Sequence, residues 1–283
     1  MNAAGITINT ANSKCIDNYR YEFTVPEGYA LKDQEVALTN AVITNSVYNL
    51  SKAGFNNVDL SYTYPSGVGM ATFAMTIPDG SYNIDVLSEY IQAQMVANKT
   101  YLVDNGGNSV FHIKLNVSSV YWGIALTCDP VPVVLPAGWS LPSGAPALPS
   151  VPTTPQLVVS PTNNFGQLIG YNAGSYPPVV QQTQYIAIGQ VEAQVTPQWA
   201  FSVSLSLVNL PTVNPSSPGS VFPFTYTVPY QGQQVLDPYN WRWFPCVDGR
   251  YTKIILTILD QEGRPAILAS KFAQFSLAFR GRL

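Results

Sequence analysis

The chain has 283 residues and a net charge of −3, and 10% of its residues are charged, against about 25% in ordinary soluble domains. This length allows one large all-β domain or two smaller ones, and no window holds the basic run that nucleic-acid binding requires. Uncharged polar residues and 17 Tyr replace the missing charges. Such a composition favours a protein that packs against neighbours, and a secreted β-sandwich with a neutral surface is the alternative.

The sequence also bears on location. The N-terminus lacks the cationic start and apolar core of a signal peptide, and no apolar run approaches the roughly 20 residues that cross a bilayer. Cys15, Cys128 and Cys246 form neither a disulfide framework nor a zinc motif. A reducing compartment is the simplest interpretation, and one disulfide with one free thiol stays open.

The first part of the chain predicts an arm followed by strands. Residues 1–16 are rich in Asn, Ala, Ser and Thr and are expected to form a flexible arm, followed by a single domain over 17–283. Apolar and polar residues alternate from Tyr19 to Val25, which predicts a strand. The same signal predicts further strands over 36–47, 56–64 and 72–77.

A single helix is predicted over about 84–97, directly after a Pro78-Asp79-Gly80 turn. The period of the apolar residues changes here from two to about 3.6, with one face formed by Ile84, Leu87, Ile91 and Met95. Asn83 is expected to cap the helix, and Asp85 lies in the first turn, where the helix dipole favours a carboxylate.

Two irregular features follow the helix. The run Asp104-Asn105-Gly106-Gly107-Asn108 predicts a hairpin turn. Residues 129–161 contain prolines without a usable period, which predicts an extended excursion of polyproline character instead of a packed sheet. Its apolar side chains, Trp139 among them, indicate that it lies on its own sandwich or on a neighbouring subunit.

Strand periodicity returns in the second half of the chain. Large apolar residues alternate with serine from Trp199 to Leu207, and the arms 252–259 and 271–279 flank a turn at 260–265. No interior boundary stands out. The sequence therefore predicts an all-β fold: a single jelly-roll sandwich of about eight antiparallel strands, with one inserted helix and long loops.

Residues suited to catalysis or metal binding are sparse. The one histidine, His112, is expected on the outward face of a strand, where a surface or interface role is favoured over that of a general base. The sequence has no Gly-x-Ser-x-Gly elbow, and the loop aspartates lack the spacing of a calcium loop. We therefore expect no enzyme activity, no catalytic residue, no metal site and no cofactor.

One aromatic cluster stands out, at residues 239–244. Its candidate contact residues are Tyr239, Trp241, Arg242 and Trp243, to which Trp139 of the proline-rich excursion is added. Trp, Tyr and Arg are the residues that most often dominate subunit interfaces. Stacked aromatic rings beside an arginine also suit a sugar-binding platform, so a carbohydrate-binding jelly-roll module, virion-borne or secreted, is the alternative function.

Three motifs together resemble those of the single-jelly-roll minor capsid, or penton, proteins of virophages, polinton-like viruses and related large DNA viruses. They are the Ile77–Tyr82 turn with its helix, the run Phe165-Gly166-Gln167-Leu168-Ile169-Gly170-Tyr171, and the Leu256–Pro265 turn followed by Phe275–Phe279. The second motif has Tyr171 where Phe is usual. The excursion over 129–161 is longer than a minimal member needs, which suggests an additional contact element.

The resemblance implies a structural protein of the virion. Five copies would form a ring that closes each icosahedral vertex, and double-jelly-roll major capsid proteins would surround it. The virion would assemble in the interior of the host cell, and residues 1–16 would reach into neighbours or beneath the shell. The resemblance implies no nucleic-acid partner and no membrane span.

Overall fold

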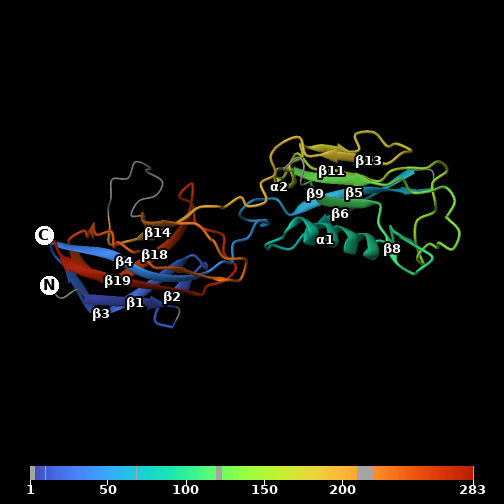
Figure 1. Ribbon diagram of the computed structural model, residues 1–283. Coiled ribbons are helices and arrows are strands. Elements are labelled where there is room, and N and C mark those ends of the chain that lie inside the picture. The colour runs from blue at the N-terminus through green and yellow to red at the C-terminus, as the bar shows by residue number, and fades with distance from the viewer. Residues whose placement is uncertain (1–3, 10, 68, 119–122, 209–219, 283) are drawn as a thin grey trace. The chain divides into compact units, whose positions relative to one another are not determined.

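A computed structural model of the chain describes residues 4–9, 11–67, 69–118, 123–208 and 220–282. The chain forms two compact units (Figure 1). Unit 1 combines Met1–Tyr48 with Gln198–Leu283, and unit 2 is Asn49–Pro197. The structure thus divides the single domain expected over 17–283 into two units. The physical reason is that each unit buries its own hydrophobic core, and the two cores share no residue.

Unit 1 is a two-sheet antiparallel sandwich. The strand orders are β1-β19-β4-β16, with β17 also on β4, and β15-β14-β18-β3-β2. The strands are β1 (Ala4–Asn9), β2 (Lys14–Ile16), β3 (Arg20–Leu31), β4 (Gln34–Thr44), β14 (Phe201–Leu205), β15 (Ser220–Phe224), β16 (Gln233–Leu236), β17 (Phe244–Pro245), β18 (Gly249–Asp260) and β19 (Ala273–Gly281).

This strand order is that of a jelly roll. When the short strands β2 and β17 are set aside, the other eight, numbered along the chain, lie in the orders 1-8-3-6 and 2-7-4-5. The first strand pairs with the eighth, the second with the seventh, the third with the sixth and the fourth with the fifth. This is the pairing of a jelly roll, which is built from two Greek keys. The predicted fold class is thus confirmed. Alternation in β14 buries Phe201, Val203 and Leu205 between the sheets, as the sequence predicts.

The expected flexible arm over 1–16 is instead largely strand in the part that the structure describes. Strand β1 pairs with β19 from Ala4 to Asn9, and β2 pairs with β3. Ile8 is fully buried in the core of unit 1. The Asn12 side chain donates to the carbonyl of Thr7 (2.7 Å) and accepts from the amide of Asn9 (2.8 Å), so it closes the end of the free strand edge. The segment is ordered despite its polar composition, because strand β1 pairs with β19 and buries Ile8 in the core.

Unit 2 contains two sheets, a two-stranded ribbon and both described helices. The sheet orders are β12-β11-β5-β6, β13-β10-β9 and β7-β8. The elements are β5 (Asp59–Ser66), β6 (Gly69–Thr76), α1 (Ile84–Ala97), β7 (Leu102–Val103), β8 (Ser109–Val110), β9 (Ile113–Ser118), β10 (Gly123–Cys128), β11 (Gln156–Val159), α2 (Phe165–Ile169), β12 (Gly174–Tyr176) and β13 (Tyr185–Ile188).

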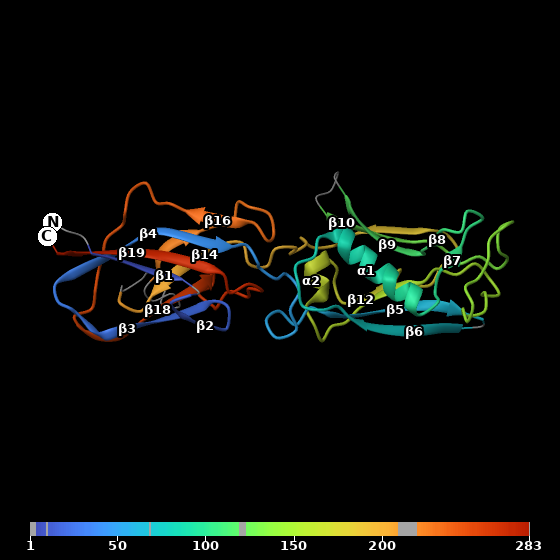
Figure 2. The same cartoon turned by 90° about the horizontal axis from the view of Figure 1, so that it is seen from below.

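Helix α1 confirms the predicted bounds, cap and apolar face. The side chain of Asn83 accepts from the amide of Val86 (2.8 Å), and the predicted apolar residues are buried. The helix lies beside β9 and β6 (Figure 2) and is tied to both, because Ser88 Oγ accepts from the amide of Leu115 and Tyr90 donates to the carbonyl of Thr76. However, the helix belongs to unit 2 and is not an insertion within the jelly-roll sandwich itself.

The proline-rich excursion over 129–161 is more ordered than the sequence predicts. An isolated bridge joins Val131 to Thr153, and residues 156–159 form β11, which pairs with both β5 and β12. The reason is that Leu157 and Val159 alternate with half-buried neighbours and fill the core of unit 2. The segment between these points, which includes the half-buried Trp139, lacks strands as expected.

Unit 2 is inserted at one point of the jelly roll. The amide of Tyr48 donates to the carbonyl of Ile267 (3.1 Å), and the amide of Ile267 donates to Oε1 of Gln198 (3.0 Å). The two ends of the insertion thus meet at a single residue. We predict that a chain in which a short Gly-Ser linker replaces 49–197 still folds, because its core is complete. Circular dichroism and a cooperative urea transition test this, and a molten product would contradict it.

Candidate interaction surface

The aromatic segment, residues 239–244, connects β16 to β17 at one end of unit 1. Its base is fixed, because Phe244 is buried and pairs with Val36 of β4. Its tip is open to solvent, since Tyr239 is 98% exposed and Trp241 is 47% exposed. Large aromatic side chains held on a buried base present contact area with little loss of conformational entropy on binding.

Charge and ring contacts hold the second half of the segment. The guanidinium of Arg280 lies 4.2 Å from the centroid of the Trp243 ring, and Glu35 Oε2 accepts from its Nε and lies within 2.8 Å of its second terminal nitrogen. Trp241 packs edge-on against Trp243, with the ring centroids 6.1 Å apart. Arg242 lies over the Phe244 ring at 5.5 Å. The segment is therefore pre-organised in the single chain.

The structure thus brings together four of the five predicted contact residues, namely Tyr239, Trp241, Arg242 and Trp243. The fifth, Trp139, belongs to unit 2 and stays a separate prediction.

A second feature of unit 1 is the part of the outer face of the sheet β1-β19-β4-β16 that lies away from the Arg280–Glu35 ion pair, here called the neutral face. Strand register aligns two rows of outward side chains: Asn9, Gln274, Val42 and Val235 in one row, and Thr7, Ser276 and Asn40 in the next. These side chains carry no charge. Val235 is 57% exposed, and Phe272, the residue before β19, is 63% exposed.

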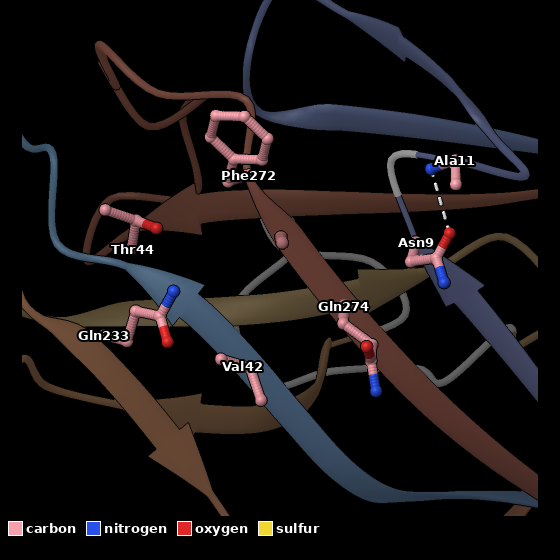
Figure 3. A pocket seen from close by; sticks show the side chains of 8 residues that line it. Asn9, Ala11, Val42, Thr44, Gln233, Phe272 and Gln274 are labelled. Atoms are coloured by element: carbon pink, nitrogen blue, oxygen red, sulfur yellow. Dashed lines mark hydrogen bonds between the residues drawn. The ribbon is translucent and has the colours of Figure 1, made fainter.

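A hollow of about 400 Å³ lies at one end of the neutral face. Figure 3 shows Val42, Thr44, Gln233 and Gln274 from the three neighbouring strands, with Phe272, Asn9 and Ala11 on its rim. The Asn9 side chain accepts from the amide of Ala11 (2.9 Å), which fixes this part of the rim. The hollow combines apolar walls with amide groups and presents no ionised group to a partner.

The outer face of the opposite sheet is different. Lys14, Arg20 and Glu22 lie on its β2–β3 side, and Lys253 of β18 forms an ion pair with Glu22 (2.7 Å). The hydrogen bond from Lys253 lowers the pKa of the Glu22 carboxyl. Charged residues are depleted in the cores of protein interfaces. Of the two outer faces of the jelly roll, the neutral face is therefore the one suited to contact.

Sequence reasoning missed the neutral face and the hollow. Asn9, Val42, Gln233 and Gln274 are far apart in the sequence, and the strand register alone brings them together. The one available signal was the uncharged alternation within each strand.

His112 lies in unit 2 and is buried, so the outward position expected from the sequence is wrong. Strand β9 begins at Ile113, and His112 precedes it, where strand alternation does not apply. Its Nδ1 lies 3.2 Å from the carbonyl oxygen of Asp129, which can only accept, and its Nε2 is buried without a hydrogen-bond partner among the residues that the structure describes. Burial lowers the pKa of His112 to about 4. An imidazole shielded in this way is not placed to act on a substrate.

Two absences characterise the part of the chain that the structure describes. Within it, no group of three or more His, Cys, Asp or Glu side chains is placed to hold a metal ion. Neither of its helices has the length and apolarity to cross a membrane.

Comparison with known proteins gives distant structural likenesses. No protein-family model matches the sequence, and no curated protein does. The crystal structure of the SeMet-labelled mavirus penton protein aligns with a TM-score of 0.42 and 8% identity, covering 99% of each chain. The cryo-EM structure of the Sputnik virophage aligns with a TM-score of 0.37 and 10% identity, covering 99% of this chain and 98% of that one. Likenesses this distant do not establish the function of this chain.

Proposed function

We propose that this chain is a structural protein of a virus capsid, a minor capsid or penton protein whose five copies close the vertices of an icosahedral shell. The observation that carries the proposal is the jelly roll of unit 1, which joins a complete eight-strand order to a neutral outer face and an exposed aromatic segment. A single chain with two different contact patches is what a cyclic ring of identical subunits requires.

The proposal assigns no reaction to the protein. Its partners are further copies of itself and the double-jelly-roll major capsid protein around the vertex, and its location is the virion, assembled in the interior of the host cell. The three sequence motifs support this role. Their positions in the fold are consistent with a structural use, since one leads into helix α1, one forms helix α2 and one closes the turn between β18 and β19.

The aromatic segment supplies the first test. Native mass spectrometry of the purified protein is expected to give five times the 30.8 kDa subunit mass. Trp241→Ala is expected to weaken association by at least about 2 kcal/mol, or roughly thirty-fold, because exposed Trp residues at contacts dominate binding energy. Trp199→Ala is the matched control, since Trp199 is also an exposed tryptophan of unit 1 and lies outside the aromatic segment.

The same variant distinguishes the proposed capsid role from the alternative function, which is carbohydrate binding. The 98% exposed Tyr239 ring beside Trp241 also offers a stacking surface for a sugar. If Trp241→Ala lost binding on a glycan array and kept the mass of the wild-type oligomer, the segment would be a carbohydrate site, and the proposed contact would be wrong.

A further inference from the structure

We propose that the hollow on the neutral face of one copy receives the aromatic segment of a second copy. This inference rests on the proposed function and deepens it, because it names the surface on which the exposed Tyr239 and Trp241 rings pack. The contact joins two different patches of the same chain, so it is directional and can be repeated around a ring.

The two patches lie at opposite ends of one sheet. The aromatic segment is anchored where Phe244 pairs with Val36 of β4, and the hollow lies at Thr44, the last residue of the same strand. Eight residues of extended strand span about 27 Å. The segment of one copy is therefore remote from its own hollow, and the partner that fills the hollow is another copy.

The chemistry of the two patches is complementary. The hollow offers the apolar side chains of Val42 and Phe272 to an aromatic ring, and the amides of Gln233 and Gln274 to a phenol hydroxyl or an indole N–H. Buried Tyr and Trp side chains need such partners. Because the hollow is uncharged, the incoming rings displace no hydrated ion from it, and the Arg242 guanidinium beside them meets no cation there.

The size of the neutral face favours a ring over a simple pair. Four strands spaced about 4.8 Å apart and about six residues long cover roughly 300 to 400 Å², whereas a stable interface buries about 800 Å² per partner. The hollow is thus the centre of a contact and not the whole of it. In a closed ring each copy uses its hollow on one side and its aromatic segment on the other, so every subunit is held twice.

A mixing experiment tests the direction of the contact. Gln274→Lys places a charge in the hollow and leaves the segment intact, and the double variant Tyr239→Ala/Trp241→Ala removes the segment and leaves the hollow intact. Each variant alone is expected to be monomeric in native mass spectrometry. Their equimolar mixture is expected to give a one-to-one heterodimer, at a higher protein concentration than the wild-type ring needs because one contact holds the pair instead of two. Nothing larger is expected, because one intact hollow meets one intact segment and the next contact is blocked.

The controls separate this inference from the proposed function. Thr24→Lys puts the same charge on the outer face of the opposite sheet, where Thr24 is exposed opposite Lys253, and is expected to keep the wild-type mass. Circular dichroism checks that each variant is folded. If Gln274→Lys keeps the wild-type oligomer while Trp241→Ala loses it, the hollow is wrong and the capsid role stands.

Two other outcomes also overturn the inference. One is a mixture of folded variants that stays monomeric while the wild type associates. The other is a wild type that is monomeric even at about 100 μM, which is well above the dissociation constants of interfaces of standard size. In that case the capsid role is decided by whether the protein is incorporated into virions.

Discussion

Replacing Asp260 by alanine is expected to lower the free energy of unfolding of unit 1 by about 3 kcal/mol, because each buried donor that loses its acceptor costs about 1 to 3 kcal/mol. The Asp260 side chain is fully buried at the end of β18. One oxygen accepts from the amides of Glu262 and Arg264, and the other accepts from the Arg264 guanidinium and from Nε2 of Gln198. Alanine leaves these donors without their acceptor.

This carboxylate joins two distant parts of unit 1. The turn between β18 and β19 closes on it, and Gln198, held by it, is the first residue of the chain after unit 2. Because Gln198 Oε1 also accepts from Ile267, the substitution is expected to loosen the point at which the insertion returns. Hydrogen exchange followed by mass spectrometry is suited to this test, because it reports the two units separately.

The control is Glu262→Ala. Glu262 pairs with Arg264 at 2.7 Å, but both side chains are more than half exposed, so its loss is expected to change stability by less than about 1 kcal/mol. An Asp260→Ala protein as stable as the Glu262→Ala protein would show that the buried network is not what holds the turn. The same comparison can be made in the chain in which a Gly-Ser linker replaces 49–197. There the change in stability is read from the shift of the urea midpoint at an unchanged m value.

The sequence predicted features that depend on neighbouring residues. Helix α1 was located correctly because the apolar period, the Asn83 cap and the preceding turn all lie within twenty residues. The alternation from Phe201 to Leu205 and the turn after Asp260 were likewise local signals. The aromatic segment was found because its residues are contiguous.

What the sequence could not predict depends on long-range pairing. The boundaries at Tyr48 and Gln198 leave no trace in composition, because strands with the same alternation lie on both sides and hydrogen bonds to Ile267 define the junction. The pairing of β1 with β19 joins the two ends of the chain. The neutral face follows from that pairing, so its members could not be grouped before the register was known.

His112 provides the second large effect. It is the one histidine of the chain, and its pKa is about 4 in the folded protein against an ordinary value of 6.5. Above pH 6.5 both the folded and unfolded states hold a neutral ring. As the pH falls below 6.5 the unfolded chain binds a proton that the folded unit 2 does not, so stability is lost progressively until about pH 4. The total is about 3 kcal/mol.

The surroundings of the ring explain this direction. Desolvation is the largest cause, and the nearby Lys114 acts in the same sense, whereas Asp129 and its carbonyl oppose the shift. Lys114 pairs with the Asp129 carboxylate at 3.4 Å, and the Tyr64 ring packs edge-on against the imidazole. None of the described residues around the ring offers Nε2 an acceptor for an added proton. Protonation therefore favours opening of unit 2.

Proton NMR of the single imidazole gives the pKa directly, and hydrogen exchange between pH 7 and 5 gives the stability of each unit. We expect unit 2 to lose stability over this range, with little contribution from carboxylates, most of which titrate lower. His112→Leu removes the titrating ring and the unpaired nitrogen, so it is expected to flatten the pH dependence of unit 2. A folded-state pKa near 6.5, or a His112→Leu protein with the wild-type pH dependence, would mean that the buried ring does not control unit 2.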